Sequence, residues 1–165
     1  VATLSAAWLV QPFFKSIEIP IFYYGILWAA LNFTAGISSY RSHKTEKKYN
    51  VNNLLMNLGL FMSFSFLLVY FLPNYFGLVF IFIIYYLRGI VTPILKNQIN
   101  LNTESNIRAT VMSVRSFVLR ISFAIIAPIL GLMADNKGIS DSFLLLSILI
   151  IIFSSISIFR LRKIS

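Results

Sequence analysis

The chain has 165 residues, of which 58% are hydrophobic, 16% aromatic and only 12% charged. Soluble globular domains contain about 45 to 50% apolar residues, so this composition excludes an ordinary water-soluble core. The net charge of +9 does not indicate nucleic-acid binding, because the basic residues fall between apolar runs instead of forming one patch. Since the chain has no cysteine, disulfide frameworks, thiol nucleophiles and thiolate metal sites are excluded as well.

The first apolar segment is too short to cross a bilayer. Residues 1–14 reach about 21 Å at 1.5 Å per residue, against about 30 Å of hydrocarbon. They begin Val-Ala-Thr, with neither Met nor a charged leader, and we therefore expect the end of a helix that starts upstream, in a fragment of a longer chain. After a polar break at residues 15–18, Pro20 begins the next apolar run at a position where a missing amide donor does no harm.

Three complete spans are predicted in the first two thirds of the chain. A charged loop, RSHKTEKKYN, separates the first span from the second. His43, the only histidine, lies in this loop, where a solvated side chain is favoured over a metal ligand or a catalytic base. A tight Pro73-Asn74 turn separates the second span from the third. The three spans are residues 20–40, 52–72 and 75–95.

Two more spans follow a polar connector, KNQINLNTESNI. Residues 109–134 carry Arg115 and Arg120 inside the apolar run and Pro128 late in it, residue types that plain lipid-facing helices avoid. This span closes on an acidic turn that contains glycine, ADNKGISDS. Residues 142–159 then form the last span, which is apolar on all sides.

These runs predict an all-α integral membrane protein in which residues 1–165 form a single membrane domain with five complete spans and one partial span. A transmembrane β-barrel would show alternating segments of about ten residues, and the runs here are twice as long and continuously apolar. A soluble helical bundle would place charges every few residues on each helix, whereas residues 52–72 and 142–159 contain none.

The basic residues lie mostly at one end of the predicted bundle. Nine of the fourteen Lys and Arg residues fall in segments 41–50, 96–108 and 160–165, and only Lys15 and Lys137 lie in the loops at the other end. The positive-inside rule therefore places the three basic segments, and with them the C-terminus, on the cytoplasmic side of a plasma or inner membrane. There the basic residues would also contact anionic lipid heads.

A set of motifs resembles the second half of the major facilitator superfamily. The sequence RAT at 108–110 with Ser113, followed by Pro128 and Gly131 before an acidic loop, looks like the eleventh helix of that family. Further matches, in chain order, are Gln11-Pro12 closing the first segment, Gly25 and Gly36 in the next helix, a basic loop, and Arg88-Gly89 with Pro93 at the tenth-helix position.

The resemblance implies a secondary transporter of twelve helices, of which this chain would be the six-helix C-terminal half with its first helix incomplete. The implied partners are the N-terminal six-helix half, the lipid bilayer and a small-molecule solute, with or without a coupling proton. No cofactor and no metal are implied. The family's loop motif Gly-x-x-x-Asp-Arg-x-Gly-Arg-Arg survives only as Gly36 and scattered basic residues, so the gating salt bridge attributed to its Asp is in doubt.

The charged candidates for a solute site are Arg88 and Arg120. Arg88 lies about 20 Å from the outer end of its span and about 10 Å from the inner end, so its side chain either snorkels to lipid phosphate or faces a wet cavity and attracts an anionic group. The resemblance places the tenth helix along the central cavity, which favours the second reading. Arg120 lies about 18 Å beyond Arg108, near the midplane, where it needs a partner or water. Arg115 is shallower and is interpreted as an interface anchor.

Uncharged polar residues are further candidates for the cavity. Gln11, Asn32, Asn57 and Tyr85 could hydrogen-bond a solute, although hydrogen bonds between helices are the commoner use of such residues in membranes. No span contains Asp, Glu or His, so a proton carrier would have to lie in the other half.

Candidate hinges for alternating access are Pro93, Pro128 and Gly131. A proline inside a span frees a backbone carbonyl and permits bending. A static kink accounts for the two prolines equally well.

Two other functions are open alternatives. An intramembrane enzyme is disfavoured, because no span contains His, Asp, Glu or Cys and the chain has neither a Gly-x-Ser-x-Gly nor a His-Glu-x-x-His motif. A non-transporting membrane scaffold or a truncated remnant would show the same sequence features as a transporter half. The substrate, the coupling ion and the direction of transport are not predicted.

Overall fold

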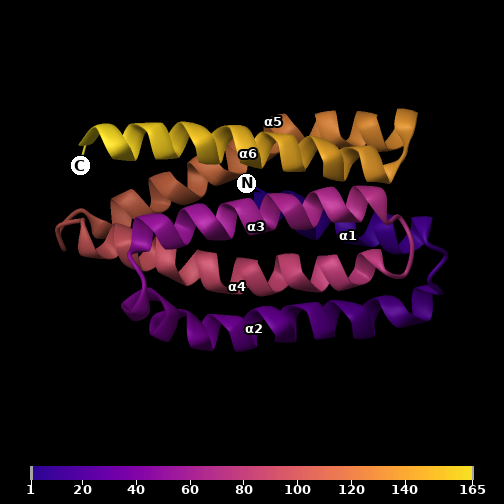
Figure 1. Cartoon of the computed structure of the whole chain (residues 1–165), viewed down its shortest axis with the longest axis horizontal. Helices are drawn as coiled ribbons and strands as arrows, with labels where there is room; N and C mark the ends of the chain where they lie inside the picture. The colour runs from indigo at the N-terminus through magenta and orange to yellow at the C-terminus, as the bar shows by residue number, and fades with distance from the viewer. Residues whose placement is uncertain (1, 165) are drawn as a thin grey trace.

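Over residues 2–164 the chain forms six long helices that lie side by side along one axis (Figure 1). The computed structural model describes the backbone of these residues and the side chains of residues 3–156. Successive helices run in opposite directions, so the chain turns back at alternating ends of the bundle. The elements are α1 (Ala2–Ser16), the short 3₁₀ helix η1 (Ile21–Tyr23), α2 (Tyr24–Lys48), α3 (Val51–Phe71), α4 (Gly77–Leu101), α5 (Arg108–Lys137) and α6 (Ile139–Ile164).

Five of these helices are long and apolar enough to cross a membrane: η1 with α2, then α3, α4, α5 and α6. Helix α1 has 15 residues and is therefore about 22 Å long, short of the hydrocarbon thickness. The described part of the chain contains no strand. The prediction of an all-helical chain with five helices long and apolar enough to cross a membrane is confirmed.

Several predicted loops are wrong because the helices continue beyond the apolar runs. The expected loop at 41–50 is helical as far as Lys48, so His43 lies exposed on α2 and not in a loop. The expected connector from residue 96 is helical as far as Leu101. Hydropathy reports only the part of a helix that lies in hydrocarbon, whereas Arg, Lys, Glu and Gln are themselves good helix formers. The break comes only at Asn50, whose side-chain oxygen caps α3 by accepting the backbone N–H of Asn52 at 3.0 Å.

The predicted acidic turn between the last two spans is reduced to Gly138. This glycine has φ 106° and ψ 158°, a backbone conformation that is essentially restricted to glycine. Just beyond it, the Ser142 hydroxyl donates to the backbone oxygen of Leu130 at 2.8 Å and ties the start of α6 to α5. The two helices therefore form a tight hairpin, and α6 begins three residues before the predicted span at 142–159 and ends after it.

The remaining turns lie at the opposite end from the basic segments. The Pro73-Asn74 turn is confirmed, and the Asn74 side-chain oxygen accepts the backbone N–H of Phe76 at 2.9 Å. Gln11-Pro12 does not close the first segment, because α1 continues through Pro12 to Ser16. The chain reverses instead at Glu18, which has a positive φ of 60°.

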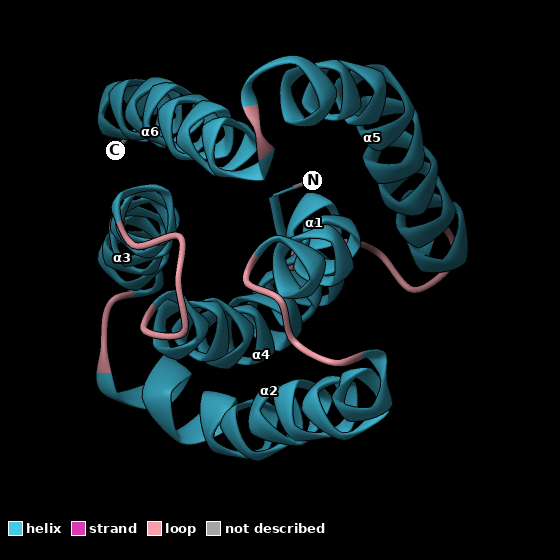
Figure 2. Cartoon of the chain, turned by 90° about the vertical axis from the view of Figure 1, so that its right-hand side faces the viewer, coloured by secondary structure: helices cyan, strands magenta, loops and turns pink. Residues whose placement is uncertain are grey.

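Helix α4 is the centre of the larger part of the bundle. It packs against α2 and α3, and α3 in turn packs against α6. Helix α1 lies in the interior and contacts α4, α5 and α6 (Figure 2). Helix α5 is the least packed candidate span, because 6% of the residues in its apolar stretch are buried, against 39% for α4. The largest fully buried side chains are Tyr85, Phe13, Phe14, Phe66 and Phe143.

Small residues allow the closest helix contacts. At the contact of α2 with α4, a Cβ added to Gly89 would collide with Ser38 Oγ and with the backbone oxygen of Ala35. Such close approach of backbones is typical of membrane helices, which associate through packing and not through the hydrophobic effect. The contact of α2 with α4 thus depends on residue 89 having no side chain.

Helices α3 and α6 are joined by a pair of buried serines. The Ser63 hydroxyl donates to the backbone oxygen of Ser147 at 3.0 Å, and the Ser147 hydroxyl donates to the backbone oxygen of Ser63 at 2.9 Å. Both residues are 1% exposed. The reciprocal bonds satisfy both hydroxyls without water, which fixes the register of the two helices.

Candidate functional site

Arg88 and Tyr85 lie together on α4, one helical turn apart. The Arg88 guanidinium carbon lies 5.3 Å from the centroid of the Tyr85 ring, a cation–π geometry. Arg88 is partly buried, and Tyr85 is fully buried. From α2, Trp28 packs edge-on against the Tyr85 ring, with the ring centroids 6.1 Å apart. We call these three residues the Arg88 cluster.

The Arg88 cluster has unused polar groups. Among the described side chains no carboxylate lies within ion-pair distance of Arg88, and the buried Tyr85 hydroxyl has no hydrogen-bond partner. A buried, unpaired hydroxyl is costly, and an unpaired guanidinium inside a span is costlier. Arg88 is the member of the pair that an anionic group can approach, because it is only partly buried, whereas the Tyr85 hydroxyl is closed off from solvent.

Gln11 and Asn32 are exposed and are not part of the Arg88 cluster. The Asn32 side-chain nitrogen donates to the backbone oxygen of Trp28 at 2.8 Å, which leaves its side-chain oxygen free. No hydrogen bond within residues 3–156 joins either side chain to Arg88. Of the uncharged candidates, only Tyr85 lies in contact with Arg88.

The two arginines of α5 differ in burial. Arg120 is exposed and Arg115 is partly buried. One turn beyond Arg120, Phe123 stacks on Trp8 of α1 with ring centroids 6.0 Å apart, so this part of α5 is turned towards α1. Trp8 itself is 66% exposed. The aromatic pair was not predicted from the sequence, and only the aromatic residue types in both helices point to it.

The candidate hinges lie in continuous helices. Pro93 is partly buried inside α4, while Pro128 and Gly131 are exposed in α5. Because a proline has no amide hydrogen, Pro93 leaves the backbone oxygen of Gly89 without its usual helical donor. This free carbonyl lies at the glycine where α4 approaches α2 most closely.

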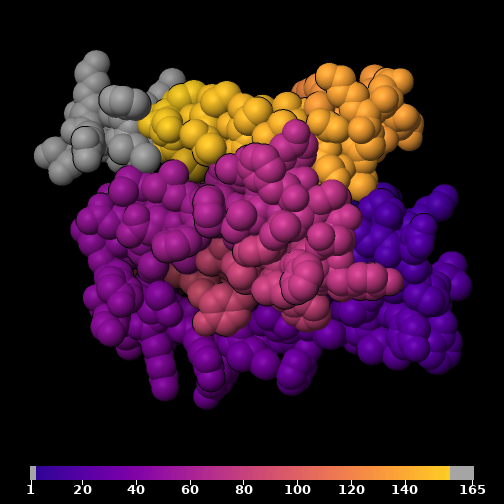
Figure 3. All heavy atoms as spheres, turned by 45° about the vertical axis from the view of Figure 1, so that its right-hand side comes forward, coloured from indigo at the N-terminus to yellow at the C-terminus, as the bar shows by residue number. Residues whose placement is uncertain are grey.

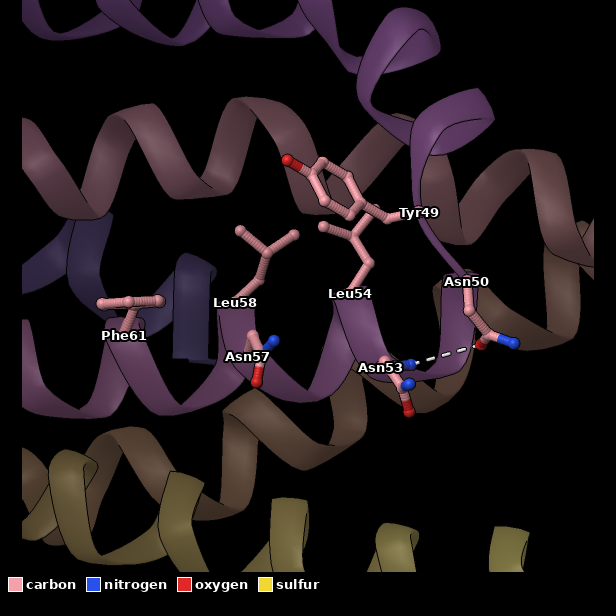
Figure 4. A pocket seen from close by; sticks show the side chains of 7 residues that line it. All are labelled: Tyr49, Asn50, Asn53, Leu54, Asn57, Leu58 and Phe61. Carbon is pink, nitrogen blue, oxygen red and sulfur yellow. Dashed lines mark hydrogen bonds between the residues drawn. The ribbon is translucent and has the colours of Figure 1, made fainter.

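A separate open pocket of about 440 Å³ lies where α3 begins (Figure 4). Asn53 and Asn57 point to one side of α3, and Tyr49, Leu54 and Leu58 to the other. Asn57, a sequence candidate for the cavity, therefore lies in a different place from Arg88. The i, i+3, i+7 spacing of three asparagines was the signal that could have indicated this pocket. The pocket is lined by Tyr49, Asn50, Asn53, Leu54, Asn57, Leu58 and Phe61.

The described residues offer no obvious cation site. No group of three or more His, Asp or Glu side chains among them could hold a metal ion. The acidic residue with the most defined surroundings is Glu46, whose Oε1 accepts the Asn97 Nδ2 at 2.9 Å and the Gln98 Nε2 at 2.8 Å. These bonds join the end of α2 to the end of α4, a structural role.

Comparison of the chain with family models, with curated proteins and with solved structures gives no match. The resemblance to the major facilitator superfamily therefore depends on the residues quoted above alone.

Proposed function

We propose that the chain is the C-terminal half of a secondary active transporter of the major facilitator type, which moves a small solute by alternating access. Its partner would be an N-terminal six-helix half that packs on the weakly buried α5 and on the exposed side of α1. The end of the bundle that carries the basic segments would face the cytoplasm.

The order in which the helices pack is the observation that supports this proposal. Helix α4 contacts α1, α2 and α3, and α1 contacts α4, α5 and α6. If α1, α2 and α3 are matched in order with α4, α5 and α6, the contacts of α4 correspond to the contacts of α1. The contact of α3 with α6 corresponds to itself. Because successive helices alternate in direction, the two triplets have inverted topology, as in transporters built from inverted repeats. The symmetry is approximate, because α2 packs on α4 far more extensively than α5 packs on α1, and the contact of α5 with α6 has no comparable counterpart between α2 and α3.

In this proposal the Arg88 cluster binds the solute. Arg88 would attract an anionic group of the solute, and the buried Tyr85 ring would hold the guanidinium in place. The partly buried Trp28 would supply an aromatic wall. Arg120 would face the other half, either in water or paired with an acidic side chain there.

Access of water to the open side of α1 tests the proposal. Residues 1–165 contain no cysteine, so once any cysteine of the other half is replaced, a single introduced cysteine can be labelled selectively with a membrane-impermeant maleimide. We expect Gln11→Cys to be labelled from both sides of the membrane in the complete protein, because alternating access wets the same position from either side in turn. Phe64→Cys is the control: Phe64 is also exposed, at 57%, but lies on α3, away from the proposed cavity. A scaffold without a cavity would leave both cysteines unlabelled, and that result would refute the transporter.

A further inference from the structure

The face of α2 that is turned away from α4 carries a stripe of exposed side chains. Phe33, Ile37 and Tyr40 are 70%, 41% and 85% exposed. Lys44 and Lys48 continue the same spacing of three or four residues and are exposed as well. Residues at these spacings share one face of a helix, so the five side chains form a single row. We call it the α2 stripe, and it changes from apolar to basic along the helix.

The α2 stripe points out of the bundle. The buried residues of α2 are Leu31, Ser38 and Ser42, which lie on the opposite face and pack towards α4. Figure 3 shows α2 (purple) along one edge of the molecule, with side chains that project away from the other helices. The stripe is therefore available to the surrounding bilayer.

The one acidic residue of this segment does not neutralise the stripe. Glu46 lies on the buried side of α2, where the amides of Asn97 and Gln98 hold its carboxylate at 2.9 and 2.8 Å. Arg41 lies one turn before Lys44 and is exposed, so it adds a third cation at the border of the apolar part. These three positive charges, with the exposed Lys47 beside them, face outward with no carboxylate among the described side chains to pair with them.

The length of α2 places these cations at the level of lipid phosphates. With η1, the span runs from Ile21 to Lys48 and its 28 residues extend about 42 Å, which is about 12 Å more than the hydrocarbon of a bilayer. Tyr40 then lies at the edge of the hydrocarbon, where amphipathic aromatic side chains are favoured. Lys44 and Lys48 lie one and two turns beyond it.

We propose that Arg41, Lys44 and Lys48 bind the phosphate of an anionic phospholipid whose acyl chains lie along Phe33 and Ile37. The apolar part of the α2 stripe favours a lipid over free phosphate, because only a lipid extends its contact into the hydrocarbon. The proposal requires that the chain crosses a membrane, but it does not depend on transport.

The test is native mass spectrometry of the purified chain in detergent, titrated with phosphatidylglycerol or phosphatidylcholine. We expect one phosphatidylglycerol molecule to be retained in preference to phosphatidylcholine. Each basic residue near an anionic headgroup contributes about fivefold in affinity. The variant Arg41→Gln/Lys44→Gln/Lys48→Gln should therefore weaken this binding on the order of a hundredfold.

Two controls make the outcome decisive. Lys15→Gln/Lys137→Gln removes the two basic loop residues at the other end of the bundle and should retain the lipid. Lys44→Arg/Lys48→Arg keeps the charge and should also retain it, which separates loss of charge from loss of fold. Equal binding of both lipids, equal loss in the Lys15/Lys137 variant, or displacement of phosphatidylglycerol by millimolar inorganic phosphate would each refute a lipid site on α2.

Discussion

Replacing Gly89 by alanine should separate α2 from α4. The added methyl group would overlap Ser38 Oγ and the backbone oxygen of Ala35, and the second of these atoms cannot move without the helix. Overpacking of this kind costs about 1 to 3 kcal/mol. Alanine also recovers about 1 kcal/mol of helix propensity relative to glycine, so the net loss of unfolding free energy should lie between about zero and 2 kcal/mol.

The matched control is Gly36→Ala on α2, where an added Cβ meets nothing within 4 Å and only the gain in propensity applies. The difference in unfolding free energy between the two variants isolates the steric term of about 1 to 3 kcal/mol. It can be measured by far-UV circular dichroism during unfolding in mixed detergent micelles. Adding Ser38→Ala to Gly89→Ala should restore part of the loss, because it removes Oγ, one of the two clashing atoms, without placing a glycine in the helix. If Gly89→Ala and Gly36→Ala are equally stable, the close approach of α2 to α4 is refuted.

Four further results are expected. Ser63→Ala should cost about 0.6 to 1.7 kcal/mol of unfolding free energy, and adding Ser147→Ala should cost a similar amount again, because the Ser147 hydroxyl donates to the Ser63 backbone oxygen, which alanine keeps. Ser116→Ala, whose hydroxyl bonds only within its own helix to the Met112 oxygen, is the control, and equal stability of the Ser63 and Ser116 variants would contradict the serine pair. Gly138→Ala should destabilise the α5–α6 hairpin by about 1 to 3 kcal/mol in the same unfolding assay, whereas Gly131→Ala, which has open space around it, should not, and equal effects would argue against strain at Gly138. In the complete transporter, Arg88→Ala should abolish solute uptake without reducing membrane insertion, with Arg88→Lys retaining part of it; unchanged uptake would remove Arg88 from the solute site. An antibody against the tail RLRKIS should detect a native polypeptide of about twice the 18.8 kDa of this chain or more, and a band at 18.8 kDa would contradict a missing N-terminal half.

The number and order of the spans could be predicted because an apolar run of about 20 residues has only the helix as a way to satisfy its backbone in lipid. The ends of the helices could not be predicted in the same way. Arg41 to Lys48 looks like a loop by hydropathy, yet these residues favour a helix, and only Asn50 provides a definite start for the next one. At the other end, nothing in the run ADNKGISDS other than its glycine marks the single residue at which the chain reverses.

The Arg88 cluster could be predicted in part. The spacing of three residues between Tyr85 and Arg88 already places them on neighbouring positions of a helix face. The approach of Trp28 depends on which face of α2 packs on α4, and that choice is made by Gly89 and the small residues opposite it. Sequence patterns within one helix cannot report such a choice, because it depends on the fit between two helices.

The unequal packing of α5 has a mechanical consequence. The most extensive helix packing joins α2 to α4, α3 to α6 and α3 to α4, whereas α5 contacts mainly α6 and, through Phe123, Trp8 of α1. A helix with few packed side chains loses little free energy when it tilts, because few contacts must break. Gly138 and the bond from Ser142 to the Leu130 oxygen hold one end of α5 on α6, so a tilt would displace the opposite end, at Arg108, the most. Within this chain, α5 is therefore the helix that tilts most easily, about a pivot at its Gly138 end.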